Sequence, residues 1–429
     1  MLLSTPAIPA FLGNTARYGW LALLAVIVAG ATSGCAGLPK DVERPVSSAL
    51  ASPAGTPLGQ LVEERRASAG GRHPSGFLLL SGPQAAYSSR LALVDAAQKT
   101  LDLQYYAIHA DASTERLLLS VVAAARRGVR VRVLLDDFHS VGRDAQVMRL
   151  AFVPNIEMRM FNPLTGARGS PLGRMFSALS DFSRVQQRMH NKLFLADNVM
   201  GVTGGRNLGD EYFDAQPDKN FRDIDLLSVG PVAEHLGHSF DQYWNSALSK
   251  PIEQFLSIRP SLRDLKNSRT RLDESLEETR KQNHALYQQL MTYTTHPRLQ
   301  VWRQELIWAW NKALWDAPSK VLSKGEPAPY LLLATQLAPE LNGVTQELIM
   351  VSAYMVPGEP GVVYLTGRAD AGVSISLLTN SLEATDVPAA HGGYAPYRKT
   401  LLKHGVQLFE LRRQSGDNGD SDNGPHLFH

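Results

Sequence analysis

The chain carries two copies of one strand–helix–strand plan, and this repeat constrains the fold more than any other feature. "QELIMVSAYMVPG" (346–358) shows the alternation of "TLDLQYYAI" (100–108), at an offset of about 250 residues. The matched positions are Ile349, Val351 and Tyr354 with Leu101, Leu103 and Tyr106. A chain of 429 residues is long enough for two domains or one large α/β unit. The repeat predicts two halves of common design.

Each copy indicates a parallel sheet flanked by helices. In the first copy we expect strands over 100–108, 129–137 and 156–162, with a helix over 113–128 between the first two. In the second, "AGVSISLLTNS" and "HGVQLFELR" take the places of the later two strands. A strand–helix–strand order of this kind favours an α/β fold of mixed sheets. The second half is expected to be incomplete.

"RMHNKLFLADNVMGVTGGRN" (188–207) predicts a β-hairpin that carries chemistry. "KLFLAD" and "NVMGVTGG" are short apolar runs that meet at the turn signal Asp197-Asn198. Residues two apart on a strand share a side, so we expect His190 and Lys192 to point the same way. An imidazole beside an ammonium suits an anionic ligand, with histidine as nucleophile or proton carrier.

The glycines and the asparagine that follow fit a phosphate ligand. Gly204 and Gly205 allow close approach of a backbone, and the amide of Asn207 donates hydrogen bonds. A carboxylate is also needed to fix the histidine tautomer.

The whole stretch resembles the H-x-K-x4-D-x6-G-G/S-x-N signature of the phospholipase D superfamily. Flanking segments such as "LDLQYYAIHAD" and "FRDIDLLSVGP" are similar to the branch close to cardiolipin synthase C, and the resemblance covers most of residues 75–412. It implies that His190 attacks phosphorus, that Lys192 and Asn207 hold phosphate oxygens, and that Asp223 orients the histidine. Asp197 is the acidic residue of the motif, and we expect it to support the hairpin. The resemblance implies neither a metal nor an organic cofactor.

The second motif of this family is missing from the sequence. Its histidine would fall near position 440, whereas the chain has 429 residues. Either two chains pair so that two copies of His190 meet, or the chain is a truncated or degenerate copy. The strands of the second half would obstruct such pairing, which favours truncation. With only one His-x-Lys pair, the activity could be impaired. A non-catalytic lipid binder is therefore one alternative function.

The N-terminal residues indicate export and lipid attachment. Arg17, the apolar run "GWLALLAVIVAG" and the small residues before Cys35 predict a lipoprotein-type signal over 1–35. Cys35 would then be lipidated on the periplasmic side of a bacterial envelope, with a weak preference for the outer membrane. A phospholipid substrate and a membrane surface are the expected partners.

Composition and the repeat divide the rest of the chain. We expect a flexible tether over 36–74, the first half over 75–250, a helical linker over 251–325, the second half over 326–412 and a polar disordered tail over 413–429.

Two further alternatives remain open from the sequence. Asp136, Asp137 and His139 follow a strand and could form a metal site, although loop or capping roles are common there. A nuclease is the other alternative function. The net charge of +2 argues neither for nor against it, but the lack of a basic stripe with interleaved aromatics argues against it. Tyr105, Tyr106 and His109 are candidates for the floor of the site, although aromatic residues at a strand end more often belong to the core.

Overall fold

The computed structural model describes residues 43–137, 144–164, 188–215, 220–254, 306–323, 325–412 and 426–428, and the single positions 281, 288 and 292. The signal segment with Cys35, His139 and most of the expected linker helix lie outside these residues. No helix in the described part of the chain is long and apolar enough to span a membrane.

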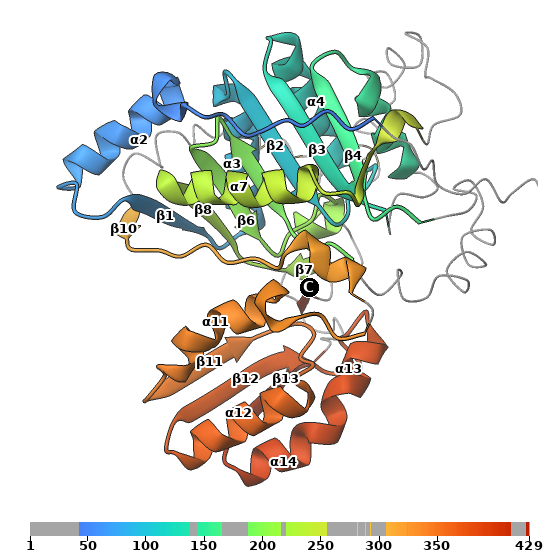
Figure 1. Ribbon diagram of the computed structural model, residues 1–429. Coiled ribbons are helices and arrows are strands. Elements are labelled where there is room, and N and C mark those ends of the chain that lie inside the picture. The colour runs from blue at the N-terminus through green and yellow to red at the C-terminus, as the bar shows by residue number, and fades with distance from the viewer. Residues whose placement is uncertain are drawn as a thin grey trace, which may run out of the picture.

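The first half is built on one mixed sheet of nine strands in the order β10-β1-β8-β6-β5-β2-β3-β4-β9 (Figure 1). Strands β2, β3 and β4 are mutually parallel, as the strand–helix–strand pattern predicts, and the remaining neighbours are antiparallel. The bounds are β1 (Ser75–Leu80), β2 (Thr100–Tyr105), β3 (Arg130–Asp136), β4 (Ile156–Phe161), β5 (Leu193–Ala196), β6 (Met200–Gly204), β8 (Asp225–Val229), β9 (Ser249–Pro251) and β10 (Ile307–Ala309).

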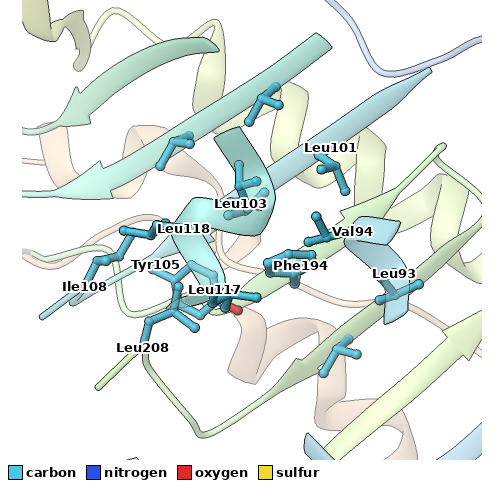
Figure 2. Close-up of a cluster of buried hydrophobic side chains, with 14 of the residues drawn as sticks. Leu93, Val94, Leu101, Leu103, Tyr105, Ile108, Leu117, Leu118, Phe194 and Leu208 are labelled. Carbon is cyan, nitrogen blue, oxygen red and sulfur yellow. The ribbon is translucent and has the colours of Figure 1, made fainter. Parts of the chain in front are cut away.

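Helices cover both faces of this sheet. One core joins α3 (Pro83–Ala96) and α4 (Ala112–Arg126) to the strands through side chains such as Leu93, Leu117 and Phe194 (Figure 2). A second core lies under α7 (Pro231–Trp244) on the other face. Helix α4 begins one residue before the expected start, because Asp111 caps it by accepting from the Thr114 N–H.

The second half forms a smaller parallel sheet in the order β11-β12-β13, lying below the large one in Figure 1. Its elements are α11 (Leu333–Asn342), β11 (Glu347–Val351), α12 (Gly358–Asp370), β12 (Ser374–Asn380), α13 (Pro388–Tyr394), α14 (Arg398–Lys403) and β13 (Gln407–Leu411). The three strands predicted by the repeat are therefore present, and the expected α/β class is confirmed.

Three segments differ from the composition-based expectations. The tether region holds α2 (Pro57–Ser68) and an extended stretch bonded to the sheet. The linker region supplies β10, which pairs with β1. In the polar tail, β14 (His426–Phe428) pairs with β7 (Asn220–Arg222). Composition misses these because each segment pairs with residues far away in the sequence.

Short 3-10 turns complete the described elements: η1 (Pro53–Gly55), η2 (Asp144–Phe152), η3 (Asp210–Tyr212), η4 (Ile252–Gln254), η5 (Pro318–Leu322), η6 (Pro329–Leu331) and η7 (Ala395–Tyr397).

Candidate functional site

His190 and Lys192 meet just before β5, rather than on the strand itself. The Lys192 Nζ lies 3.2 Å from Nδ1 and 3.4 Å from Nε2 of His190, and it donates to the His190 carbonyl at 3.0 Å. The Tyr106 ring centroid is 4.7 Å from that of His190 and 5.6 Å from the Lys192 ammonium. The expected side-by-side arrangement is therefore present, with an aromatic ring against both residues.

Asp136 at the end of β3 holds the segment that leads into His190. Its carboxylate accepts from Arg188 Nε at 2.8 Å and from the Met189 N–H at 3.0 Å. Arg188 also donates to the Asn162 carbonyl at 3.1 Å, just past the end of β4. The carboxyl ends of two parallel strands thus fix the backbone on which His190 stands. The described residues contain no cluster of metal-ligating side chains at this edge.

Burial sets the electrostatics of the site. It lowers the pKa of Lys192 to about 7, although the nearby carboxylates, Asp223 first among them, act in the opposite direction. Burial also raises the pKa of Asp223 to about 7, against the charges of Arg206 and Lys192. An anion between these groups would favour the charged lysine, which is the behaviour expected of a phosphate site.

At Gly204 and Gly205 any side chain would collide with carboxylates of the protein itself. The two glycines are therefore needed for more than the close approach of a ligand. A Cβ at Gly205 would lie 2.0 Å from Oδ1 of Asp223, and one at Gly204 would lie 2.1 Å from Oδ1 of Asp225. The end of β6 therefore passes directly beside the Asp223–Asp225 segment. These glycines bring Asp223 toward the motif.

Asn207 is fully buried and both ends of its amide contact the protein. Its Oδ1 accepts from the Ala107 N–H at 3.1 Å, and its Nδ2 donates to the Tyr212 hydroxyl at 2.9 Å. The amide is thus fixed in orientation next to Tyr106, the residue that packs on His190.

Asp197 is not brought together with His190. It lies at the far end of β5, where Asp197 and Asn198 both have positive φ, 48° and 52°, in the turn of the hairpin. Its buried carboxylate accepts from the backbone N–H groups of Gln98, Lys99 and Thr100 at 3.1, 2.7 and 2.9 Å. These bonds join the hairpin to the start of β2, and the supporting role of Asp197 stays a prediction.

Sequence reasoning missed a buried ion-pair group behind the site. Arg90 of α3 donates to Oδ2 of Asp225 at 2.8 Å and to the Tyr105 hydroxyl at 3.1 Å. Arg206 lies 3.7 Å from the same Asp225 oxygen. Asp225 lies two residues after Asp223, so the pattern "RDIDL" did indicate a second carboxylate near the site. Nothing near Arg90 in the sequence indicated its partner.

The second half also contributes to the surroundings of the site. The Tyr354 hydroxyl donates to Oδ1 of Asp386 at 2.8 Å. Burial first, and then Asp386 and Asp223, raise the pKa of Tyr354 far above its ordinary value. Tyr354 is the repeat counterpart of Tyr106, so the two halves present equivalent tyrosines toward one site. On the first half, Nε2 of His109 pairs with Glu211 at 3.3 Å.

Comparisons with known proteins agree with this geometry. The family described as "Cardiolipin synthase, PLD-like domain" matches residues 91–244, which include the His190 segment. Cardiolipin synthase C of Escherichia coli (strain K12) is 37% identical over 344 residues, 80% of this chain and 70% of that protein. An uncharacterised protein of Helicobacter pylori (strain ATCC 700392 / 26695) is 31% identical over 382 residues, 89% of this chain and 74% of that protein.

One solved structure matches most of the chain. Phosphatidylserine synthase of Haemophilus influenzae Rd KW20 aligns with a TM-score of 0.51 at 13% identity, covering 86% of this chain and 78% of that one. At this identity the likeness concerns the fold.

Proposed function

This chain belongs to the phospholipase D superfamily, in the branch around cardiolipin synthase C, and we propose that it transfers a phosphatidyl group through a phosphohistidine at His190. The observation that carries the proposal is the contact of His190 with Lys192 beside the carboxylate of Asp223. A nucleophile, a cation for the phosphate and a carboxylate within one buried site are the parts that phosphodiester exchange requires.

The reaction proceeds in two displacements at phosphorus. A ring nitrogen of His190 forms a P–N bond as the P–O bond to the leaving alcohol breaks, and the alcohol takes up a proton. An acceptor alcohol, such as another glycerolipid, or water then gives up its proton and attacks phosphorus, which releases the histidine. Lys192 neutralises the charge on the phosphate oxygens in both steps, and the fixed amide of Asn207 helps to orient them.

The proton exchange with the two alcohols calls for a second histidine. The sequence holds one His-x-Lys pair. A homodimer that brings two copies of His190 together would supply the second histidine only where the second half, with Tyr354 beside the site, leaves room for the partner. A preparation without such pairing is expected to be impaired.

A phospholipid is the proposed substrate because the chain aligns over most of its length with a cardiolipin synthase. We further propose that Cys35 is lipidated and tethers the enzyme on the periplasmic side of the envelope, with the outer membrane as the preferred location.

The test uses residues 36–429, with the molar mass measured by light scattering and the products by mass spectrometry. With phosphatidylglycerol vesicles we expect new phosphatidyl-transfer or hydrolysis products in the dimeric fraction, and none from His190→Ala. Nicking of plasmid DNA without lipid turnover would support a nuclease instead. Lipid binding without turnover of either substrate would support a non-catalytic binder.

A further inference from the structure

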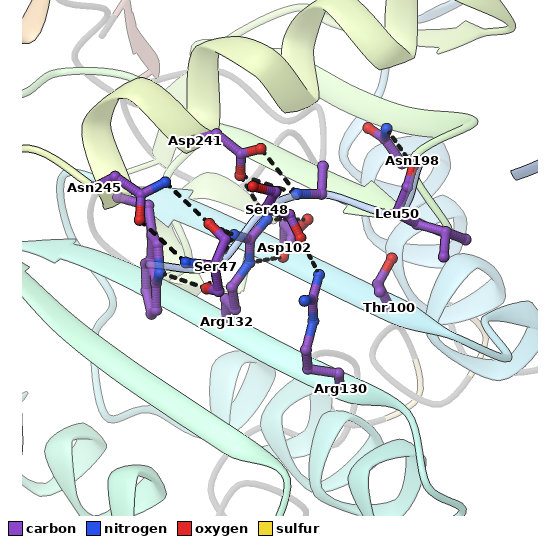
Figure 3. Close-up of polar contacts among 12 residues, drawn as sticks. Ser47, Ser48, Leu50, Thr100, Asp102, Arg130, Arg132, Asn198, Asp241 and Asn245 are labelled. Atoms are coloured by element: carbon purple, nitrogen blue, oxygen red, sulfur yellow. Dashed lines mark hydrogen bonds and ion pairs between the residues drawn. The ribbon is translucent and has the colours of Figure 1, made fainter. Parts of the chain in front are cut away.

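An extended strap, residues 44–50, lies in a polar groove of the first half, between α7 and the start of β2 and β3 (Figure 3). The Ser47 carbonyl accepts from Arg132 at 2.9 Å and from Asn245 at 3.0 Å, and its hydroxyl accepts from the Trp244 indole at 2.9 Å. The Ala49 N–H donates to Asp241 at 2.8 Å. Bonds of this number along so short a segment fix its path on the protein.

The groove is itself rigid, because its central residue Arg132 is fully buried. Its guanidinium donates to both oxygens of Asp102, at 2.7 and 2.9 Å, and pairs with Asp241 at 2.9 Å. It also lies over the rings of Phe240 and Trp244 at 4.7 and 5.5 Å. The Ser47 carbonyl is a further hydrogen-bond partner of the Arg132 guanidinium, so the strap binds a preformed site.

The strap crosses β3 and β4, where Arg132 donates to the Ser47 carbonyl and Arg159 to the Pro45 carbonyl. Its downstream end is at the hairpin turn, where Asn198 donates to the Leu50 carbonyl at 2.9 Å. Its upstream end is at the segment before β9, where Arg44 donates to the Ala247 carbonyl at 2.7 Å.

The upstream end lies at the edge that carries the catalytic histidine. Next to Ala247, the Leu248 carbonyl accepts from the Asn162 N–H at 3.0 Å. The Asn162 carbonyl in turn accepts from Arg188, two residues before His190. Arg44, at the upstream end of the strap, therefore contacts the segment that lies next to the support of His190.

The bound strap also shortens the length of chain that separates Cys35 from the folded domain. A tether over all of residues 36–74 would reach more than about 100 Å when extended, whereas the nine steps from Cys35 to Arg44 span at most about 30 Å. Arg44 and Lys250 lie close enough at this exit for the charge of Arg44, after burial, to lower the pKa of Lys250. Positive charge at the exit suits anionic lipid headgroups.

From these contacts we propose that the strap orients the enzyme on the membrane: it holds the His190 edge toward the phospholipid surface, within about 30 Å of the lipid on Cys35. The proposal rests on the proposed lipid anchor and deepens the proposed function, since it names the face that meets the substrate.

The experiment measures orientation rather than turnover. The membrane form is isolated, with Cys35 lipidated, so that a cysteine introduced at Ala247 or at Gln98 is the one free thiol. Ala247 marks the catalytic edge, where only its backbone carbonyl binds Arg44. Gln98 is exposed beside the hairpin turn at the other edge. Each is labelled with a fluorophore and quenched by vesicles containing nitroxide headgroup lipids.

We expect several-fold stronger quenching at the Ala247→Cys site than at the Gln98→Cys site. A Gly-Ser insertion of about 16 residues, with a root-mean-square span of about 22 Å, is then placed after Gly37. It should remove most of the difference, because it lengthens the chain before the strap. The same insertion after Ala51, beyond the strap, is the matched control and should leave the difference unchanged.

Three results would overturn the proposal. Equal quenching of both labels would show that the domain has no fixed orientation. A difference that survives insertion after Gly37 would show that something other than the strap sets it. Free Cys35 in the membrane form would remove the short anchor, while phosphatidyl transfer by residues 36–429 would still stand or fall on its own assay.

Discussion

The ammonium of Lys192 lies 3.2 Å from Nδ1 of His190, in a site whose burial lowers the lysine pKa to about 7. The folded chain therefore holds this cation at a cost in stability, which a bound phosphate would relieve. Sites that bind and transform anions often keep such a strained charge.

Replacing Lys192 by methionine should stabilise the protein while abolishing turnover. Because the folded-state pKa is below that of a free lysine, the buried charge is most unfavourable below about pH 7. Between pH 7 and about 10 the folded lysine is neutral while the unfolded one still binds a proton, so wild-type stability rises with pH. We expect Lys192→Met to raise the free energy of unfolding by on the order of 2 kcal/mol at pH 6, and by less at pH 9.

Denaturant unfolding at the two pH values measures this effect, with the exposed Lys403→Met as the control. A gain in stability that is equal at both pH values, or a loss at pH 6, would show that Lys192 is not under this strain.

Asp197 should matter for folding and not for chemistry. Its carboxylate accepts three backbone N–H groups at the turn distant from His190. Asp197→Ala leaves these donors without their acceptor, and we expect a loss of about 3 kcal/mol in unfolding free energy. At a temperature where the variant is folded, kcat should stay within about twofold of the wild type. The exposed Glu64→Ala is the control for stability, and a large fall in kcat with normal stability would assign Asp197 to catalysis.

A methyl group at Gly205 should act through Asp223. The added Cβ would lie 2.0 Å from Oδ1 of Asp223, so the carboxylate must shift from its position in the site. A displacement of about 1 Å at a reacting site costs roughly 100-fold in rate, and we expect a fall of that order in kcat/KM. Gly367→Ala, where a Cβ has no neighbour within 4 Å, is the matched control.

A double variant separates this mechanism from general damage. If Gly205→Ala works by moving Asp223, then adding it to Asp223→Asn should cost little more than Asp223→Asn alone. Fully additive losses would mean that the two positions act independently.

Tyr354 should connect the second half to the reaction. Its hydroxyl is held by Asp386 at 2.8 Å, and the charge of Asp223 reaches it. Tyr354→Phe keeps the ring and removes one hydrogen bond to a charged group, so we expect a loss of about 1 kcal/mol in unfolding free energy. If this hydroxyl also supports the reaction, kcat/KM should fall about tenfold. The control is Tyr330→Phe, whose side chain is 76% exposed. Unchanged kinetics in Tyr354→Phe would confine the site to the first half.

The sequence predicted the parts of this fold that depend on local patterns. Alternation placed β2, β3 and β4, and the Asp197-Asn198 pair placed the hairpin turn, because both signals are contained within a few residues. The motif spacing also brought His190 and Lys192 together correctly. The family membership and α/β class expected from these residues are confirmed.

Long-range pairing explains what the sequence did not predict. Arg90 and Asp225 are 135 positions apart and form a buried ion pair behind the site. The strap reads as a flexible Pro- and Ser-rich tether because its partners, among them Arg132 and Asp241, lie in the sheet and in α7. A glycine is needed at position 205 because Asp223, in the connection between β7 and β8, lies directly beside it. Composition and periodicity do not indicate which distant residues make contact.

The covalent step at His190 is the central claim, and trapping the intermediate tests it most directly. A short-chain phospholipid is mixed with the active preparation, the reaction is stopped at alkaline pH, where a phosphohistidine survives, and the peptides are analysed by mass spectrometry. We predict a phosphatidyl adduct on His190 in the wild type, and neither adduct nor turnover in His190→Ala. Turnover that persists in His190→Ala, or that proceeds in the wild type with no modified His190, would contradict the account.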